Sequence, residues 1–137
     1  MIKYMNLIGQ NAKKASLEKI NTKTKNKILK RYALLLNKEK SSIIIENTKD
    51  IKFALKKGLK KNLIDRLTIN HKKLDDIKAS INKIIKLKDP VDNILEKWSR
   101  PNGLKIKRVS IPIGVIGIIY ESRPNVTSDV ASLCFKS

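Results

Sequence analysis

The fold of this chain is constrained most by an apolar run that leads into a polar turn and then into a helical pattern. Residues 115–120 are apolar and largely β-branched, as in a strand buried within a parallel sheet. The polar turn 121–125 reads Glu-Ser-Arg-Pro-Asn, and after it a helix is indicated by apolar residues at helical spacing, Val126, Val130, Leu133 and Cys134. Strand, loop and helix in this order form the first half of a βαβ unit, and open α/β sheets bind ligands at the carboxyl ends of their strands. The sequence therefore predicts an α/β fold with its functional residues in the loop 121–125.

The preceding residues predict a layer of helices, each with one apolar stripe and lysines opposite. We expect a helix over 2–16, a second from an N-cap at Thr22 or Thr24 to about Asn37, and a third from an N-cap at Ser41 or Ser42 to Gly58. A fourth long helix is expected from Asn70 to Asp89-Pro90, with a short helical turn before it at 63–67. The residues predicted to face inward are Ile2, Met5, Ile8, Ala12 and Ala15; Leu29, Tyr32, Ala33 and Leu36; Ile44, Ile45, Ile51, Ala54 and Leu55; and Leu74, Ile77, Ile81, Ile84 and Ile85.

A hairpin is predicted between the helices and the apolar run. Residues 95–100 and 104–111 alternate apolar and polar side chains, and the Pro101-Asn-Gly103 turn between them contains an Asn-Gly pair. Trp98 is expected to pack on this hairpin. The predicted organisation is a helical part over 1–90, a hairpin of the oligomerisation type over 91–111, and the start of a Rossmann-like core over 112–137. Gly114 and Gly117 weaken a strand and suggest close approach by another backbone or by a ligand.

The net charge of +19 raises the possibility of a basic, helical nucleic-acid-binding protein. Against this, lysine outnumbers arginine 26 to 5, aromatic residues make up only 4% of the chain, and the lysines are scattered. Lysine, isoleucine and asparagine are all abundant and all have A/T-rich codons, which favours a base-biased genome as the explanation. We therefore expect no specific nucleic-acid partner.

Other features of the composition favour a cytoplasmic protein. One cysteine cannot form an internal disulfide, the N-terminus lacks the apolar core of a secretory signal, and no apolar run approaches the ~18 residues of a membrane span. The single histidine, His71, stands beside lysines without a second imidazole or thiolate cluster, so no metal site is expected.

Several segments together resemble the N-terminal part of the gamma-glutamyl phosphate reductases, also called glutamate-5-semialdehyde dehydrogenases, of the aldehyde dehydrogenase superfamily. The most specific is Pro112 to Thr127, with its Tyr-Glu-Ser-Arg-Pro-Asn loop, and the resemblance covers essentially the whole chain. The other matching segments are 59–67 with the following helix, 89–91, 100–104, and Asp129, Ala131, Leu133, Cys134, Lys136 and Ser137.

The resemblance implies the reduction of gamma-glutamyl phosphate to glutamate-5-semialdehyde with NADPH and release of phosphate, in proline biosynthesis. It also implies that Asn125 donates a hydrogen bond to the oxyanion formed in the reaction, as developing charge generally requires. Backbone groups of five loop residues would border the nicotinamide end of NADP: Tyr120, Glu121, Ser122, Arg123 and Pro124. The whole enzyme is expected to be a homo-oligomer.

The residues alone leave alternatives for this loop. Asparagine before a helix is a favoured N-cap, so Asn125 has a structural explanation as well. Arg123 suits a substrate carboxylate or phosphate, and equally an exposed loop position. Glu121 is a weak candidate for acid–base work because it lacks a second carboxylate.

Cys134 is predicted to be a buried core residue and not the nucleophile of the family, because apolar burial raises the pKa of a thiol. The segment that would carry the nucleophile is expected to follow residue 137. We therefore expect the 137-residue polypeptide to be inactive alone, either as part of a longer enzyme or as the product of a decayed gene.

Overall fold

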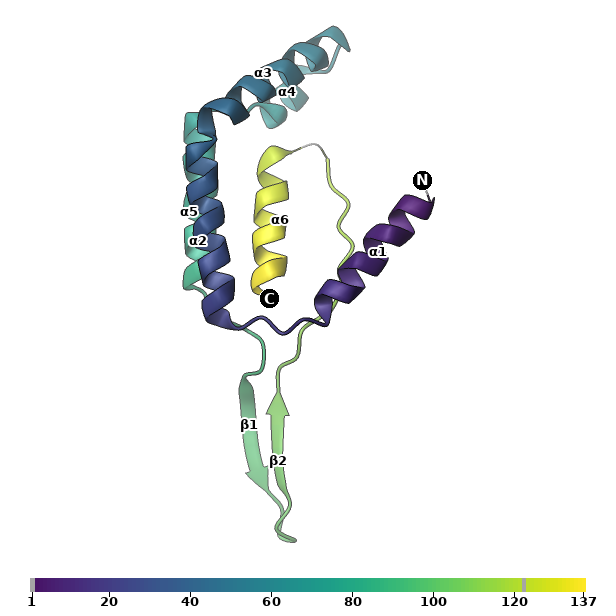
Figure 1. Ribbon diagram of the computed structural model, residues 1–137, viewed down its shortest axis with the longest axis vertical. Coiled ribbons are helices and arrows are strands. Elements are labelled where there is room, and N and C mark those ends of the chain that lie inside the picture. The colour runs from purple at the N-terminus through teal and green to yellow at the C-terminus, as the bar shows by residue number, and fades with distance from the viewer. Residues whose placement is uncertain (1, 122) are drawn as a thin grey trace. The chain divides into compact units, whose positions relative to one another are not determined.

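The computed structural model describes residues 2–121 and 123–137, and they divide into two units (Figure 1). The first unit comprises residues 2–20, 88–117 and 137, and the second comprises 21–87 and 118–136. The first contains helix α1 (Ile2–Ser16) and the strands β1 (Ile94–Ser99) and β2 (Lys105–Val109). The second contains five helices: α2 (Thr22–Lys38), α3 (Lys40–Lys56), α4 (Lys61–Leu67), α5 (His71–Lys86) and α6 (Pro124–Lys136). The predicted helices and hairpin are confirmed, but the described residues form no parallel sheet.

The core of the second unit lies between α2 and α5, which run side by side (Figure 1). Every apolar residue predicted to face inward on these two helices is buried or partly buried. Leu29 and Ala33 of α2 meet a stripe on α5 at spacings of three and four, made by Leu74, Ile77, Ile81 and Ile84. Ile81 is fully buried, which makes it the centre of this core.

Asparagine side chains begin both core helices. Asn21 Oδ1 accepts from the Thr24 amide at 2.9 Å, and Asn70 Oδ1 accepts from the Lys73 amide at 2.8 Å. An asparagine cap of this kind satisfies one of the unpaired amides of the first turn. The predicted helix start at Asn70 is confirmed. The predicted cap of α2 is wrong, because Thr22 and Thr24 lie inside the helix and Asn21 caps it.

Helix α3 differs from the prediction at both its start and its inward face. It begins at Lys40 after Glu39, without a capping side chain, so neither Ser41 nor Ser42 is a cap. Ile45 and Leu55 are each 59% exposed, because the residues turned inward are Ile43, Ile44, Ile51, Asn47 and Ala54.

Gly58 ends α3 as predicted. It adopts a left-handed conformation with φ of 70°, which costs glycine nothing because it has no Cβ. The Gly58 amide donates to the Leu55 carbonyl at 3.0 Å, and the Leu59 amide donates to the Ala54 carbonyl at 3.1 Å. These two bonds form a Schellman motif, which turns the chain sharply toward α4.

The buried face of α6 is polar and small, which corrects the prediction for this helix. Ser128, Ser132 and Lys136, spaced by four, are buried against α2 and α5, whereas Leu133 and Cys134 are exposed. Serines permit a close approach of helix backbones that Leu133 would prevent. Lys136 Nζ donates to Asn26 Oδ1 at 2.6 Å, so the buried lysine is hydrogen-bonded. Cys134 is therefore not a core residue within the described chain.

The hairpin in the first unit is antiparallel and pairs Trp98 with Ile106. Its loop is three residues long: the Arg100 amide donates to the Leu104 carbonyl, and Gly103 occupies the left-handed position with φ of 85°. Trp98 lies on the hairpin as predicted and is 40% exposed.

The predicted buried strand at 115–120 is wrong for the described chain. These residues form no strand and are all exposed, Ile119 completely so. A strand needs a neighbour for its backbone hydrogen bonds, and the described residues supply none beside this segment. The inward stripe predicted for residues 2–16 is also wrong, because no residue of α1 is buried.

Candidate functional site

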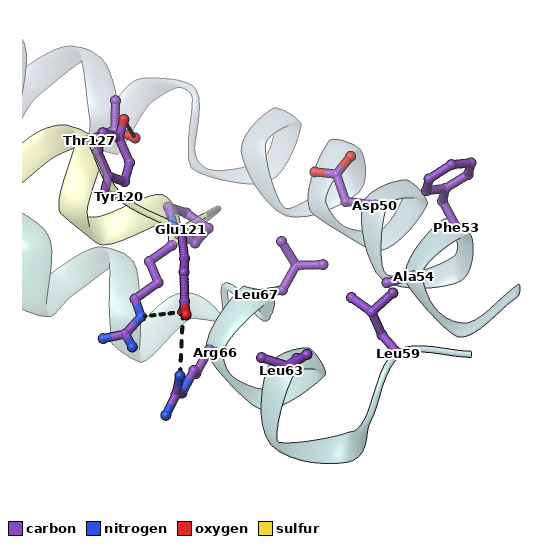
Figure 2. A pocket seen from close by; sticks show the side chains of 12 residues that line it. Asp50, Phe53, Ala54, Leu59, Leu63, Arg66, Leu67, Tyr120, Glu121 and Thr127 are labelled. Atoms are coloured by element: carbon purple, nitrogen blue, oxygen red, sulfur yellow. Dashed lines mark hydrogen bonds and ion pairs between the residues drawn. The ribbon is translucent and has the colours of Figure 1, made fainter. Parts of the chain in front are cut away.

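A pocket of about 910 Å³ opens at the start of α6, within the second unit (Figure 2). It is bounded by α3, by α4 and by the chain leading into α6. The pocket is lined by apolar side chains and by four charged ones. Asp50, Phe53 and Ala54 come from α3; Leu59, Leu63, Arg66 and Leu67 from α4 and the turn before it; Tyr120, Glu121, Arg123, Pro124 and Thr127 from the loop and α6.

One carboxylate joins two arginines at the rim of this pocket. Glu121 Oε2 lies 3.3 Å from Arg66 Nη1 and 3.3 Å from Arg123 Nε, as the dashed lines in Figure 2 show. The three side chains are between 43% and 62% exposed, so water screens the pairs and each contributes little to stability. The arrangement holds two guanidinium groups beside one another, which is how proteins bind carboxylates and phosphates.

A buried asparagine fixes the helix that carries Arg66. Asn47, 4% exposed, donates from Nδ2 to the Leu67 carbonyl at 3.0 Å and accepts at Oδ1 from the Ile69 amide at 2.7 Å. Lys73 Nζ donates to the carbonyls of Asp65 and Thr68. The carbonyl groups at the end of α4 are thereby satisfied, and Arg66 is held on a rigid element.

The loop side of the pocket is fixed by a proline and a tyrosine. Pro124 is the first residue of α6, a position that suits proline because a backbone N–H there would have no helical partner. The hydroxyl groups of Tyr120 and Thr127 lie 2.8 Å apart and are hydrogen-bonded, which ties the loop back onto the first turn of α6.

Four of the six residues predicted to form the site line this pocket: Tyr120, Glu121, Arg123 and Pro124. Asn125 lies in the first turn of α6 with an exposed side chain, and it does not line the pocket. Because α6 begins at Pro124, Asn125 is not its N-cap, and the structural explanation considered for it is wrong. The sixth residue, Ser122, lies outside the described residues.

The sequence analysis missed the partners supplied by α3 and α4. Arg66 is 55 residues away from Glu121, and Asp50 is farther still, so no local motif links them to the loop. Among residues 2–121 and 123–137, no three His, Cys, Asp or Glu side chains are grouped as a metal site would require. No helix in the same ranges is long and apolar enough to cross a membrane.

Comparison with known proteins identifies the family. No family model matches the sequence. A gamma-glutamyl phosphate reductase from Sulfurihydrogenibium is 47% identical over 136 residues, which cover 98% of this chain and 30% of that relative. One from Nautilia profundicola is 51% identical over 118 residues, covering 86% and 29%.

Solved structures agree with the sequence comparison. The crystal structure of a gamma-glutamyl phosphate reductase from Thermotoga maritima matches 93% of this chain with a TM-score of 0.88 and 40% identity. That from Saccharomyces cerevisiae matches 96% with a TM-score of 0.89 and 30% identity. The chain belongs to the gamma-glutamyl phosphate reductase family. It spans about 30% of the length of the curated relatives it matches and 31% to 34% of the two solved chains.

This finding confirms the resemblance drawn from the loop 120–125 and its neighbouring segments. The Rossmann-like core remains a prediction, because the described residues contain only a two-stranded antiparallel sheet.

Proposed function

We propose that this chain forms the N-terminal part of an enzyme that reduces gamma-glutamyl phosphate to glutamate-5-semialdehyde with NADPH and releases phosphate, in proline biosynthesis. The observation that supports the proposal is the 47% identity to a gamma-glutamyl phosphate reductase over 98% of the chain. An alignment of this extent spans the loop and the helix start on which the reaction is expected to depend.

Asn125 is the residue we propose to act on the reacting carbonyl. Its amide is exposed in the first turn of α6 and makes no hydrogen bond with the described residues, so its Nδ2 is free to donate to an oxyanion. A donor held in position before the charge develops stabilises the transition state without reorganisation. Replacing Asn125 with alanine is expected to lower kcat by about 100-fold or more.

The first turn of α6 also has features that fit the nicotinamide end of a cofactor. Helix N-termini present unpaired amides and a partial positive charge, which suit a carboxamide oxygen or an anion. We propose that backbone groups of Tyr120, Glu121, Ser122, Arg123 and Pro124 border NADP there. The cofactor would supply the hydride, while these residues position it beside the carbonyl.

Cys134 is not proposed as the nucleophile, although it is exposed. It follows Asn125 by nine residues on the same helix, a separation of about 13 Å at the helical rise per residue. A nucleophile must form a bond to the same carbonyl carbon whose oxygen Asn125 contacts, and that distance is too long. We therefore expect Cys134→Ser to retain activity and the 137-residue chain alone to have none.

The test is a stoichiometric assay on a full-length reductase that begins with this sequence. We expect one NADPH to be oxidised and one phosphate to be released for each gamma-glutamyl phosphate consumed. Oxidation of NADPH without phosphate release, or no reaction at all, would contradict the proposal. Turnover by the isolated 137-residue chain would contradict the proposed inactivity.

A further inference from the structure

We propose that the pocket bounded by α3, α4 and the loop before α6 binds the amino-acid head group of the substrate, its ammonium and α-carboxylate together. The inference rests on the proposed function and deepens it, because it concerns the end of the substrate that does not react. Its basis is the charge, the composition and the layout of the residues that line the pocket.

Two arginines provide the site for the carboxylate. Arg66 and Arg123 each direct one nitrogen at the same Glu121 oxygen, 3.3 Å away. A guanidinium group has five N–H donors, so both arginines keep donors for a second anion. Glu121 holds the pair together and offsets part of the repulsion between the two cations.

The composition of the lining supports a guanidinium site over a general basic surface. The chain has 26 lysines and 5 arginines, yet two of the arginines and none of the lysines line this pocket. The fork of a guanidinium matches the two oxygens of a carboxylate, whereas an ammonium acts as a point charge. The base bias that explains the lysines elsewhere therefore does not explain this pocket.

The charge balance indicates a zwitterion. Asp50 and Glu121 offset Arg66 and Arg123, so the lining has no net charge although the chain carries +19. A dianionic phosphate would meet two carboxylates without a surplus of cations. An amino-acid head group, with one charge of each sign, leaves every charge in the pocket paired.

Asp50 is the group we assign to the ammonium. It makes no hydrogen bond or ion pair with the described residues, unlike Asp75 and Glu46, which pair with lysines. Figure 2 shows it on α3, apart from the arginine cluster, with the Leu67 side chain between the two. Three leucines of the lining, Leu59, Leu63 and Leu67, offer an apolar surface for the methylene groups of the substrate.

The experiment uses the full-length reductase in the reverse direction, where glutamate-5-semialdehyde, phosphate and NADP+ are varied separately. Arg66→Ala and Asp50→Asn are expected to raise KM for the semialdehyde by about tenfold to 100-fold, the effect of losing a hydrogen bond to a charged group. KM for phosphate is expected to stay within about twofold of the wild-type value, because the phosphate is not assigned to this pocket. Arg66→Lys should fall between the wild type and Arg66→Ala.

Arg108→Ala is the matched control. Arg108 pairs with Glu96 at 3.5 Å on the hairpin and does not line the pocket, so its removal tests the loss of an exposed arginine alone. A rise in KM for phosphate instead of the semialdehyde would overturn the assignment, and so would unchanged KM values in Arg66→Ala.

A binding measurement separates this inference from the proposed function. L-Norvaline has the head group without a reactive end, and pentanoate lacks the ammonium. We expect calorimetry to show that norvaline binds and that Arg66→Ala and Asp50→Asn each weaken its binding about tenfold or more. Pentanoate is expected to bind more weakly than norvaline, and only Arg66→Ala should weaken its binding further. Norvaline binding of this kind in a protein without reductase activity would support the pocket and contradict the function. Turnover without norvaline binding would contradict the pocket alone.

Discussion

Helix α5 and the segment 111–119 are both rich in isoleucine, and they have opposite fates. In α5 the apolar stripe from Leu74 to Ile84 is buried, with Ile81 fully inaccessible. In 111–119 every residue is exposed. A helix satisfies its backbone internally and needs only a partner surface, which α2 provides, whereas an extended segment needs a neighbouring strand as well. Apolar composition therefore indicates a capacity for burial, and the available partner decides whether burial occurs.

The largest expected effect tests that contrast with one substitution at two sites. Ile81→Ala removes a fully buried side chain and is expected to lower the free energy of unfolding by about 2–5 kcal/mol. Ile119→Ala changes the same atoms on a residue that is 102% exposed, and a change within about 0.5 kcal/mol is expected. Urea denaturation followed by circular dichroism measures both.

Equal losses at the two sites would contradict the comparison, because they would mean that Ile119 is buried in solution. If the wild type loses its circular dichroism signal as the protein concentration rises and Ile119→Ala does not, the exposed segment causes association, which is the hazard of an unpaired edge.

The next contrast is between two asparagines: Asn47, which is buried and hydrogen-bonded to backbone groups, and Asn62, which is exposed on α4. Asn47→Ala removes the hydrogen bonds with the Leu67 carbonyl and the Ile69 amide, and it leaves both groups without this partner. The expected cost is about 2–3 kcal/mol, since one partly buried donor and one partly buried acceptor are left unsatisfied. Asn62→Ala, an exposed change on α4, is the control. A loss of the same size in Asn62→Ala would contradict this expectation, because Asn62 does not make these two hydrogen bonds.

The sequence predicted the helices and the hairpin because their signals are local. Helical spacing locates α2 and α5, Gly58 marks a left-handed turn, and Asn-Gly marks the hairpin loop. The buried face of α6 escaped prediction because two serines and a lysine are small or hydrogen-bonded there, which no apolar pattern reveals. The loop half of the pocket was predicted from the strand-loop-helix pattern, and the family resemblance then assigned roles to its residues. Its other half, Asp50 and Arg66, depends on tertiary packing.

Ser132 gives a smaller effect with the opposite sign. It is 1% exposed, and its Oγ has no hydrogen-bond partner among the described residues. Replacing it with alanine removes an unsatisfied hydroxyl while keeping the side chain small enough for close helix packing. Ser132→Ala is expected to raise the free energy of unfolding by about 1 kcal/mol. Ser41→Ala, at an exposed position, is the control, and destabilisation by Ser132→Ala would show that the hydroxyl is paired in solution.

The smallest effect concerns an exposed ion pair between α3 and α5. The hydrogen bond from Lys40 Nζ, 2.8 Å from Asp75 Oδ1, lowers the pKa of the Asp75 carboxyl, and the charges of Lys40, Lys78 and His71 act in the same direction. Because this pKa is lower in the folded chain, the pair stabilises the fold above the ordinary aspartate pKa, and the contribution disappears as the pH falls through the folded value.

Carboxyl NMR titration checks the assignment, with Lys40→Met as the partner variant. The Asp75 pKa is expected to rise toward its ordinary value when Lys40 is removed, while the melting temperature at neutral pH changes little, because exposed pairs contribute little to stability. An unchanged pKa in Lys40→Met would mean that the hydrogen bond is absent in solution. A large loss of stability would mean that this contact matters as much as the α2–α5 core, contrary to the exposure of Asp75.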